Sequence, residues 1–106
     1  MNYSPGGNCY KKAHHILASA AKTSDMLAGW ALCHGTMRGV EGADICGHAW
    51  VEFEGLVLDP TFGTIAQKNY YAIGDVREVT RFSWDEAKEK LRTTGHYGPW
   101  DKRGTP

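Results

Sequence analysis

Three residues of the chain have the types and the order of a cysteine–histidine–aspartate triad. Cys9 follows a Gly-Gly-Asn segment, His48 lies within an alternating apolar and polar run, and Asp59 ends the next apolar run. A thiol becomes a nucleophile when a neighbouring base takes its proton, and a third group must fix the tautomer and orientation of that base. These residue types therefore predict an activated thiol that attacks carbonyl carbon atoms.

Cys9 is expected at the start of a helix over residues 9–22. The apolar residues of this segment recur at helical spacing on one face: Ala13, Ile16, Leu17, Ala20 and Ala21. Asn8 is a good N-cap residue, and Cys9 lies four residues before Ala13, on the same face. Unpaired N–H groups at a helix N-terminus stabilise a thiolate and can donate to an oxyanion.

His48 and Asp59 are expected on neighbouring strands of a hairpin. The alternation predicts a strand over residues 45–53, a turn at Glu54-Gly55 and a return strand over residues 56–59. A two-residue turn places Asp59 on the same face as His48, diagonally offset but within reach of its side chain. A three-residue loop without a bulge would turn Asp59 to the other face.

The remaining segments predict a single α+β domain over residues 1–106, with a cysteine-bearing helix packed on a mainly antiparallel sheet. Further strands are expected over residues 30–37, 70–73 and 76–82. Ser83 and Glu86 form a capping-box pattern for a C-terminal helix to about Thr93. Residues 1–8 read as a loop, and the tail over residues 101–106 as a mobile end.

The histidine-to-aspartate region carries a family resemblance. Residues 47–52 (Gly-His-Ala-Trp-Val-Glu) and 58–61 (Leu-Asp-Pro-Thr) resemble the transglutaminase-like core of the papain-like cysteine peptidase superfamily. The resemblance implies a small papain-like fold, with Cys9 as nucleophile, His48 as base and Asp59 as the orienting group. It also implies acyl transfer through a thioester on peptide, isopeptide or glutamine side-chain amides, as in a peptidase, deamidase or transglutaminase.

The second donor to the oxyanion is left open by the sequence. Papain-like enzymes use an upstream glutamine, and little chain precedes Cys9 here; Asn2, Asn8 and Gln67 are the side-chain candidates. Trp50, two residues after the predicted base, either walls the substrate site or packs as an ordinary large aromatic residue.

The composition of the chain limits the classes of partner that are expected. Twelve basic and twelve acidic residues give no net charge, which provides no electrostatic footprint for nucleic acid or an anionic membrane. No apolar run is long enough to span a membrane, and no secretory signal is recognisable, so a cytoplasmic protein with reduced cysteines is expected. The expected partner is a protein or peptide substrate, with no metal or organic cofactor.

Two other interpretations compete with the enzyme. Cys33, His34, Cys46 and His48 have the ligand types of a zinc site, but Cys33 and His34 are adjacent and would point to opposite faces of a strand. The same small fold with a vestigial triad would serve as a binding or inhibitor module, for example a phage protein acting on a host partner. His14 and His15 are expected to be solvent-exposed, because they lie off the apolar stripe or at its edge.

Overall fold

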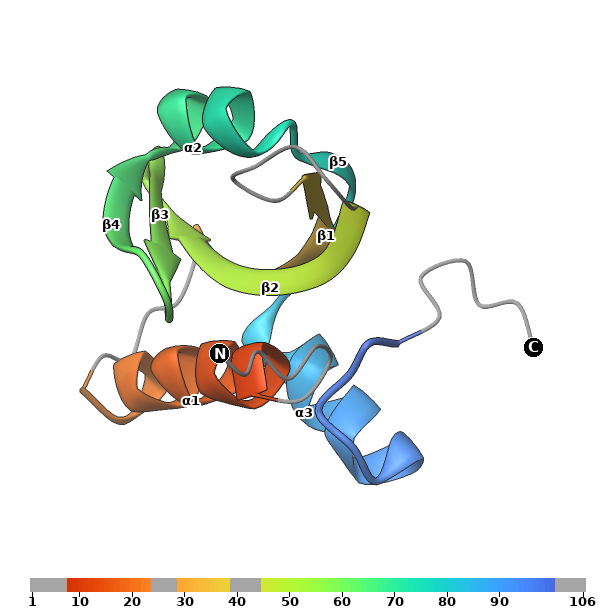
Figure 1. Ribbon diagram of the computed structural model, residues 1–106. Helices are drawn as coiled ribbons and strands as arrows, with labels where there is room; N and C mark the ends of the chain where they lie inside the picture. The colour runs from red at the N-terminus through yellow and green to blue at the C-terminus, as the bar shows by residue number, and fades with distance from the viewer. Residues whose placement is uncertain (1–7, 24–28, 39–44, 101–106) are drawn as a thin grey trace.

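The computed structural model describes residues 8–23, 29–38 and 45–100, and shows a curved antiparallel sheet between helices (Figure 1). The elements in chain order are α1 (Asn8–Thr23), β1 (Trp30–Arg38), β2 (Ile45–Phe53), β3 (Leu56–Asp59), β4 (Gly63–Ala66), α2 (Gln67–Gly74), β5 (Arg77–Phe82) and α3 (Trp84–Thr94). The sheet has five strands in the order β4-β3-β2-β1-β5. The α+β class is therefore confirmed. The expected end segments 1–7 and 101–106 lie outside the described residues.

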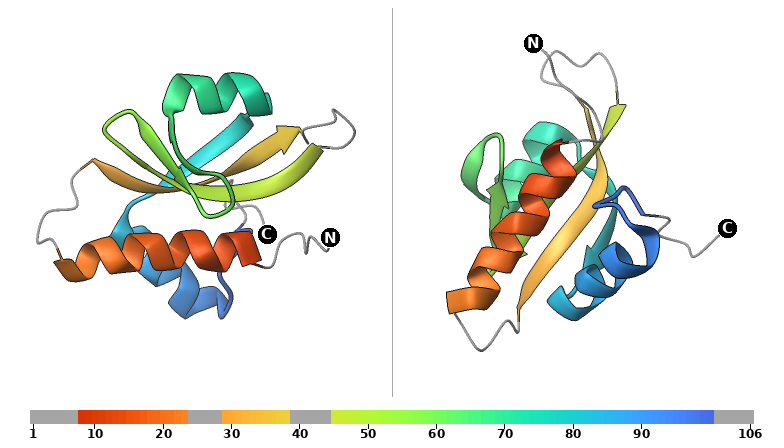
Figure 2. Two further views of the ribbon diagram at one scale, coloured as in Figure 1. Left: turned by 60° about the vertical axis from the view of Figure 1, so that its left-hand side comes forward. Right: turned by 90° about the horizontal axis from the view of Figure 1, so that it is seen from below.

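The helices cover both faces of the sheet. α1 and α3 lie on its convex side, whereas α2 lies over its concave side (Figures 1 and 2). A core cluster that includes Cys9, Leu17, Ala49 and Val51 fills the interface with α1. A second cluster, which contains Trp50, Val57 and Tyr70, lies on the other face. Because successive side chains of β2 point to opposite faces of the sheet, this strand contributes residues to two separate cores.

The predicted hairpin is confirmed with its register. Glu54 and Gly55 both have positive φ, 52° and 79°, as a two-residue turn between twisted strands requires. The pairing of Val51 with Leu58 continues the strands from this turn. The expected helix over 9–22 and the strands over 30–37 and 76–82 agree with the structure to within one residue at each end.

The predicted strand over residues 70–73 is wrong. These residues form α2, and β4 was not expected before it. The aromatic and branched residues at 70–73 favour a strand locally, but Tyr70 and Gly74 are both buried, one helical turn apart. Packing of this face on the sheet outweighs the local preference.

The prediction that His14 is solvent-exposed is also wrong. It is only 4% exposed, whereas His15 is exposed as expected. The rings of Trp84 and Tyr97 lie 5.3 and 5.0 Å from the His14 ring, so α3 and the segment after it cover this side of α1. The sequence pattern of α1 alone carries no information about these long-range neighbours.

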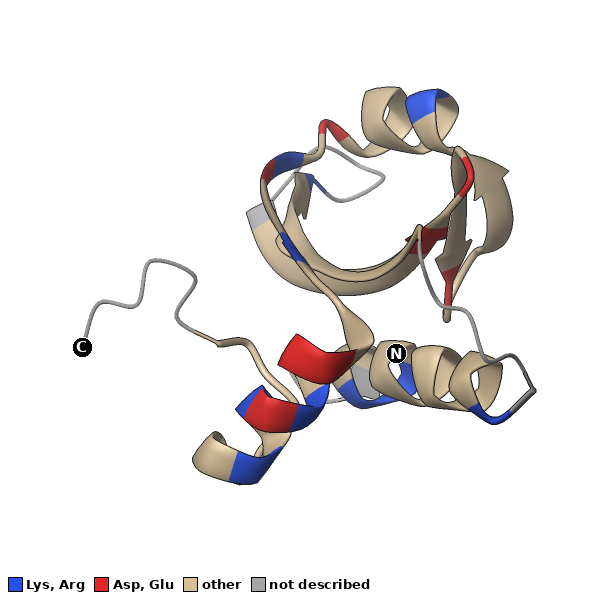
Figure 3. Ribbon diagram, turned by 180° about the vertical axis from the view of Figure 1, so that it is seen from behind, with Lys and Arg blue, Asp and Glu red and all other residues tan. Residues whose placement is uncertain are grey.

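Charged residues of both signs are mixed along α3, as Figure 3 shows. Its N-terminus has the predicted capping box, in which Ser83 accepts from the Glu86 N–H and the Glu86 carboxylate accepts from the Ser83 N–H. No helix in the described segments is long and apolar enough to cross a membrane.

Candidate active site

Cys9 lies in the first turn of α1, where the backbone N–H groups have no partner within the helix. Its side chain is 8% exposed and packs in the cluster on the α1 side of the sheet. The small Ala13, one turn further along, is fully buried against the same strands. The helix therefore holds the sulfur at the boundary between its N-terminus and the sheet.

His48 and Asp59 are hydrogen-bonded. The His48 Nε2–H donates to Asp59 Oδ2 at 2.8 Å, and both residues are buried. The two-residue turn is the cause, because it places Asp59 diagonally across from His48 on the same face. The predicted placement of Asp59 within reach of the His48 side chain is confirmed.

The Cys9 thiol lies close enough to the His48 ring to contribute to the raised pKa of that ring. Because Nε2 is engaged by Asp59, Nδ1 is the ring nitrogen left for the sulfur. β3 pairs only with residues 51–53 of β2, so the part of β2 that carries His48 has an open edge on that side. β1 pairs with the other edge of β2 along its whole length.

The surroundings of His48 favour its protonated form. Burial alone would lower the pKa of the ring, but the hydrogen bonds to Asp59 and Cys9 outweigh burial and raise the pKa to about 9. Burial likewise opposes ionisation of Asp59, yet the hydrogen bonds from His48 and Tyr70 hold the pKa of this carboxyl below its usual range. The pair is arranged as a carboxylate beside an imidazolium.

Asp59 is fixed by donors on both of its oxygens. The N–H groups of Thr61 and Phe62 donate to Oδ1 at 2.6 and 2.9 Å, which closes a tight turn after β3. The Tyr70 hydroxyl donates to Oδ2, the oxygen that also receives His48. Sequence reasoning missed Tyr70, because its role depends on α2 lying over the sheet, and no local pattern reports that.

The other predicted site residues have different positions. Gln67 donates to Glu52 Oε1 at 2.8 Å, and Glu52 lies four residues, or about 13 Å of strand, from His48. Trp50 is fully buried, donates to Glu52 Oε2 at 2.9 Å, and stacks 6.2 Å from the His48 ring. The structure therefore places Trp50 against the His48 ring and does not bring Gln67 to Cys9. Asn8 opens α1, but its side chain lies outside the described residues.

Glu52 is the centre of a second polar network. It is 6% exposed and also accepts from Tyr71 and from Arg81 Nε, the latter at 3.1 Å. Burial opposes its ionisation, but the hydrogen bonds from Trp50 and Tyr71 and the charge of Arg81 keep the pKa of this carboxyl low. The network locks the indole that stacks on His48, which supports the base from one side.

The four residues of the zinc alternative do not converge. Cys33 is buried in the cluster with Trp50, whereas the His34 ring lies 5.1 Å from Phe82 on the opposite face. Across the described segments, no group of three or more histidine, cysteine or acidic side chains is placed to hold a metal ion.

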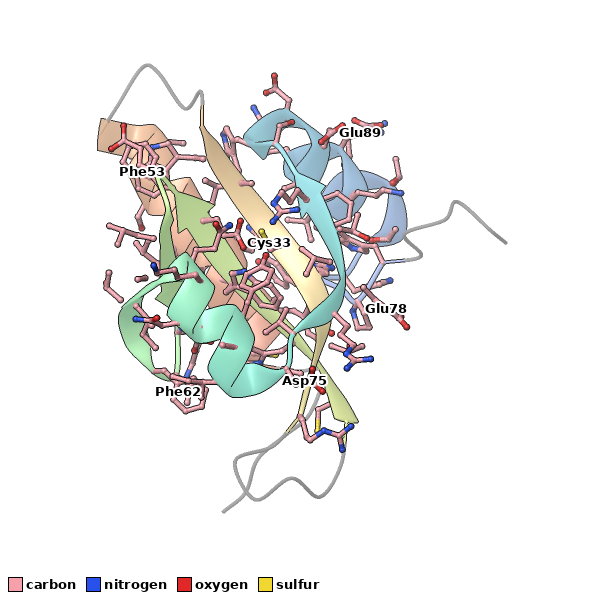
Figure 4. All side chains as sticks on the ribbon, turned by 90° about the horizontal axis from the view of Figure 1, so that it is seen from above. Cys33, Phe53, Phe62, Asp75, Glu78 and Glu89 are labelled. Carbon is pink, nitrogen blue, oxygen red and sulfur yellow. The ribbon has the colours of Figure 1, made fainter. Side chains whose placement is uncertain are left out.

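A cavity of about 600 Å³ opens on the α2 side of His48. Its apolar walls are Met37, Phe62, Ile65, Tyr70, Ile73 and Gly74, and its polar lining consists of Arg38, Cys46, His48 and Thr61. In the view onto α2, the labelled Phe62 and Asp75 lie toward the same end of the sheet, and Cys33 lies nearer its centre (Figure 4). The cavity thus lies at the end of the sheet that carries His48.

Comparison with protein families, with curated proteins and with solved structures found no match for this chain.

Proposed function

We propose that the protein is a cysteine-dependent acyl-transfer enzyme that acts on amide bonds through a thioester intermediate. The observation that carries the proposal is the buried hydrogen bond between His48 and Asp59, beside a Cys9 thiol that lies close enough to the ring to raise its pKa. A nucleophile, a base and a group that orients the base, each supplied by a different element, are the requirements for covalent catalysis of this kind. The resemblance of residues 47–52 and 58–61 to the transglutaminase-like core supports the same assignment.

In this proposal each residue has one role. The Cys9 thiolate attacks the amide carbonyl carbon, and a C–S bond forms as the carbonyl π electrons move to oxygen. The oxyanion receives the Cys9 N–H, which has no partner within the helix in the first turn of α1. The C–N bond then breaks, and the His48 imidazolium gives its proton to the leaving nitrogen. Water or an amine, which gives its proton to the now neutral His48, then forms a C–O or C–N bond to the acyl carbon as the C–S bond breaks, and the product is an acid or a new amide.

The protonation state of His48 fits this sequence. A pKa of about 9 keeps the ring protonated at neutral pH, and the buried Asp59 carboxylate balances its charge. An imidazolium next to a sulfur stabilises the thiolate, and it is also the acid that a departing amine requires. One ring therefore serves both steps.

The test is the rate of iodoacetamide labelling against pH, with each modified cysteine located by mass spectrometry. We expect Cys9 to label at least tenfold faster at pH 7 in the wild type than in His48→Ala. Cys46 is a matched internal control, because it is half-buried and only two residues from His48. A second variant, Asp59→Asn, keeps the size of the side chain and serves if His48→Ala fails to fold.

The alternative function is a binding or inhibitor module that does not use the thiol. It predicts slow labelling of Cys9 that is indifferent to His48, and unchanged affinity for a partner protein after Cys9→Ala. That outcome would overturn the enzyme assignment and leave the triad as a structural hydrogen-bond network.

A further inference from the structure

The cavity is suited to an apolar occupant of small-molecule size. Its volume of about 600 Å³ lies within the usual range for small-molecule sites. Five of its lining residues are apolar or aromatic, and a sixth is a glycine. Two of the apolar residues, Phe62 and Ile73, lie at the opening and are 53% and 80% exposed. The free energy falls when an apolar group covers exposed apolar side chains beside a cavity, because apolar surface is removed from water.

The charges at the cavity do not favour an ionic occupant. Arg38 is the only Lys or Arg among the described lining residues, and its Nε lies 3.5 Å from Asp75 Oδ2. No Asp or Glu is among those lining residues, so an ammonium group inside the cavity would have no counter-ion. The occupant that fits is a neutral alkyl or aromatic group.

His48 is the point of contact between the cavity and the triad. It lines the cavity, whereas Cys9 and Asp59 do not. Cys9 belongs to α1 and packs in the core cluster between α1 and the sheet, whereas residues of α2 line the cavity. A group in the cavity therefore approaches the reaction centre from the side of the ring rather than from the side of the sulfur.

The acyl and amine parts of an amide substrate separate at the acylation step. The acyl group stays on the sulfur, whereas the amine receives its proton from the imidazole and leaves on the side of the ring. The amine that later attacks the thioester passes through the same position, because the reverse of expulsion follows the same path. We infer that the cavity binds the substituent of the leaving or incoming amine, and that this substituent is apolar.

This inference rests on the proposed function, and the experiment separates the two. The protein is first treated with p-nitrophenyl acetate: the Cys9 sulfur forms a C–S bond to the acetyl carbon, the C–O bond breaks, and p-nitrophenolate leaves. A burst of p-nitrophenolate with acetylation at Cys9, absent in Cys9→Ala and reduced in His48→Ala, supports the proposed function. Without that burst both the proposed function and the inference fail.

The acetyl-enzyme is then mixed with methylamine or hexylamine, two primary amines of nearly equal basicity. The amine nitrogen forms a C–N bond to the acetyl carbon as the C–S bond breaks, the neutral His48 ring of the acetyl-enzyme takes the proton of the attacking nitrogen, and the thiolate–imidazolium pair is restored. We expect hexylamine to release the acetyl group at least tenfold faster than methylamine at equal concentration, with saturation, and to yield N-hexylacetamide.

Two surface variants test whether the cavity causes this preference. Phe62→Gln and Ile73→Gln together replace exposed apolar residues at the opening and should reduce the ratio of the hexylamine rate to the methylamine rate at least threefold. Leu56→Gln is the matched control, because Leu56 is 42% exposed but does not line the cavity.

A normal burst with equal rates for the two amines would overturn the inference and leave the proposed function standing. A different result would assign the cavity to the acyl side: p-nitrophenyl hexanoate would acylate Cys9 faster than the acetate, in a way that depends on Phe62 and Ile73, without any preference for hexylamine. That result would also overturn the inference.

Discussion

Asp59→Asn should remove most of the upward shift in the pKa of His48. In the wild type the pKa is raised from 6.5 to about 9, which corresponds to about 3 kcal/mol in favour of the imidazolium. Burial opposes this shift, whereas Asp59 and Cys9 support it. When the Asp59 charge is removed and burial remains, the pKa should fall well below 9, toward 6.5.

The substitution retains most of the local structure. The asparagine carbonyl oxygen can still accept from the N–H groups of Thr61 and Phe62, which hold the turn after β3. Its NH₂ group, however, faces Nε2 and donates to it, so the neutral ring carries its proton on Nδ1. The nitrogen that should receive the thiol proton is then already protonated, and Cys9 labelling should slow at least tenfold at pH 7.

The assay is an NMR titration of isotope-labelled histidine rings between pH 4 and 10, with iodoacetamide labelling on the same samples. Asp75→Asn is the matched control, because Asp75 is a half-exposed carboxylate that pairs with Arg38 and Arg77 away from His48. A wild-type His48 that titrates near 6.5, or one whose pKa is unchanged by Asp59→Asn, would refute the reasoning.

Three predictions concern stability. The raised pKa of His48 adds stability that is fully present below pH 6.5 and is lost as pH rises from 6.5 to about 9. Burial lowers the pKa of His34 to about 4, so the stability that the neutral His34 ring adds is lost as pH drops from 6.5 toward 4. Urea midpoints should therefore be highest near pH 6.5; a midpoint that rises steadily from pH 5 to 9 would contradict this. Gly47→Ala should cost about 1–3 kcal/mol, because its Cβ would lie 2.6 Å from the Tyr10 hydroxyl oxygen, and Tyr10→Phe in the same chain should recover part of that loss if the contact is the cause. Ser83→Ala removes the N-cap of α3 and should lower the free energy of unfolding by about 1 kcal/mol, measured in urea, while Ser83→Asp should keep most of it.

The sequence by itself determined the local part of the site. The turn at Glu54-Gly55 fixes the register of β2 and β3, and that register alone brings His48 and Asp59 to one face. The apolar spacing of residues 9–22 sets the buried side of α1 and thus the side on which Cys9 lies. Each of these features depends on residues close together in the chain, so their patterns could be interpreted without the fold.

Only the tertiary structure decided what surrounds the triad. Residues 70–73 have strand preference, yet they form a helix because one of its faces is buried on the sheet. This packing brings Tyr70 to Asp59 and closes the cavity beside His48. The segment after α3 likewise buries His14, and the carboxylate of Glu52, not the oxyanion, receives Gln67. These contacts join residues distant in sequence, and their free energy comes from burial and hydrogen bonds that no local spacing records.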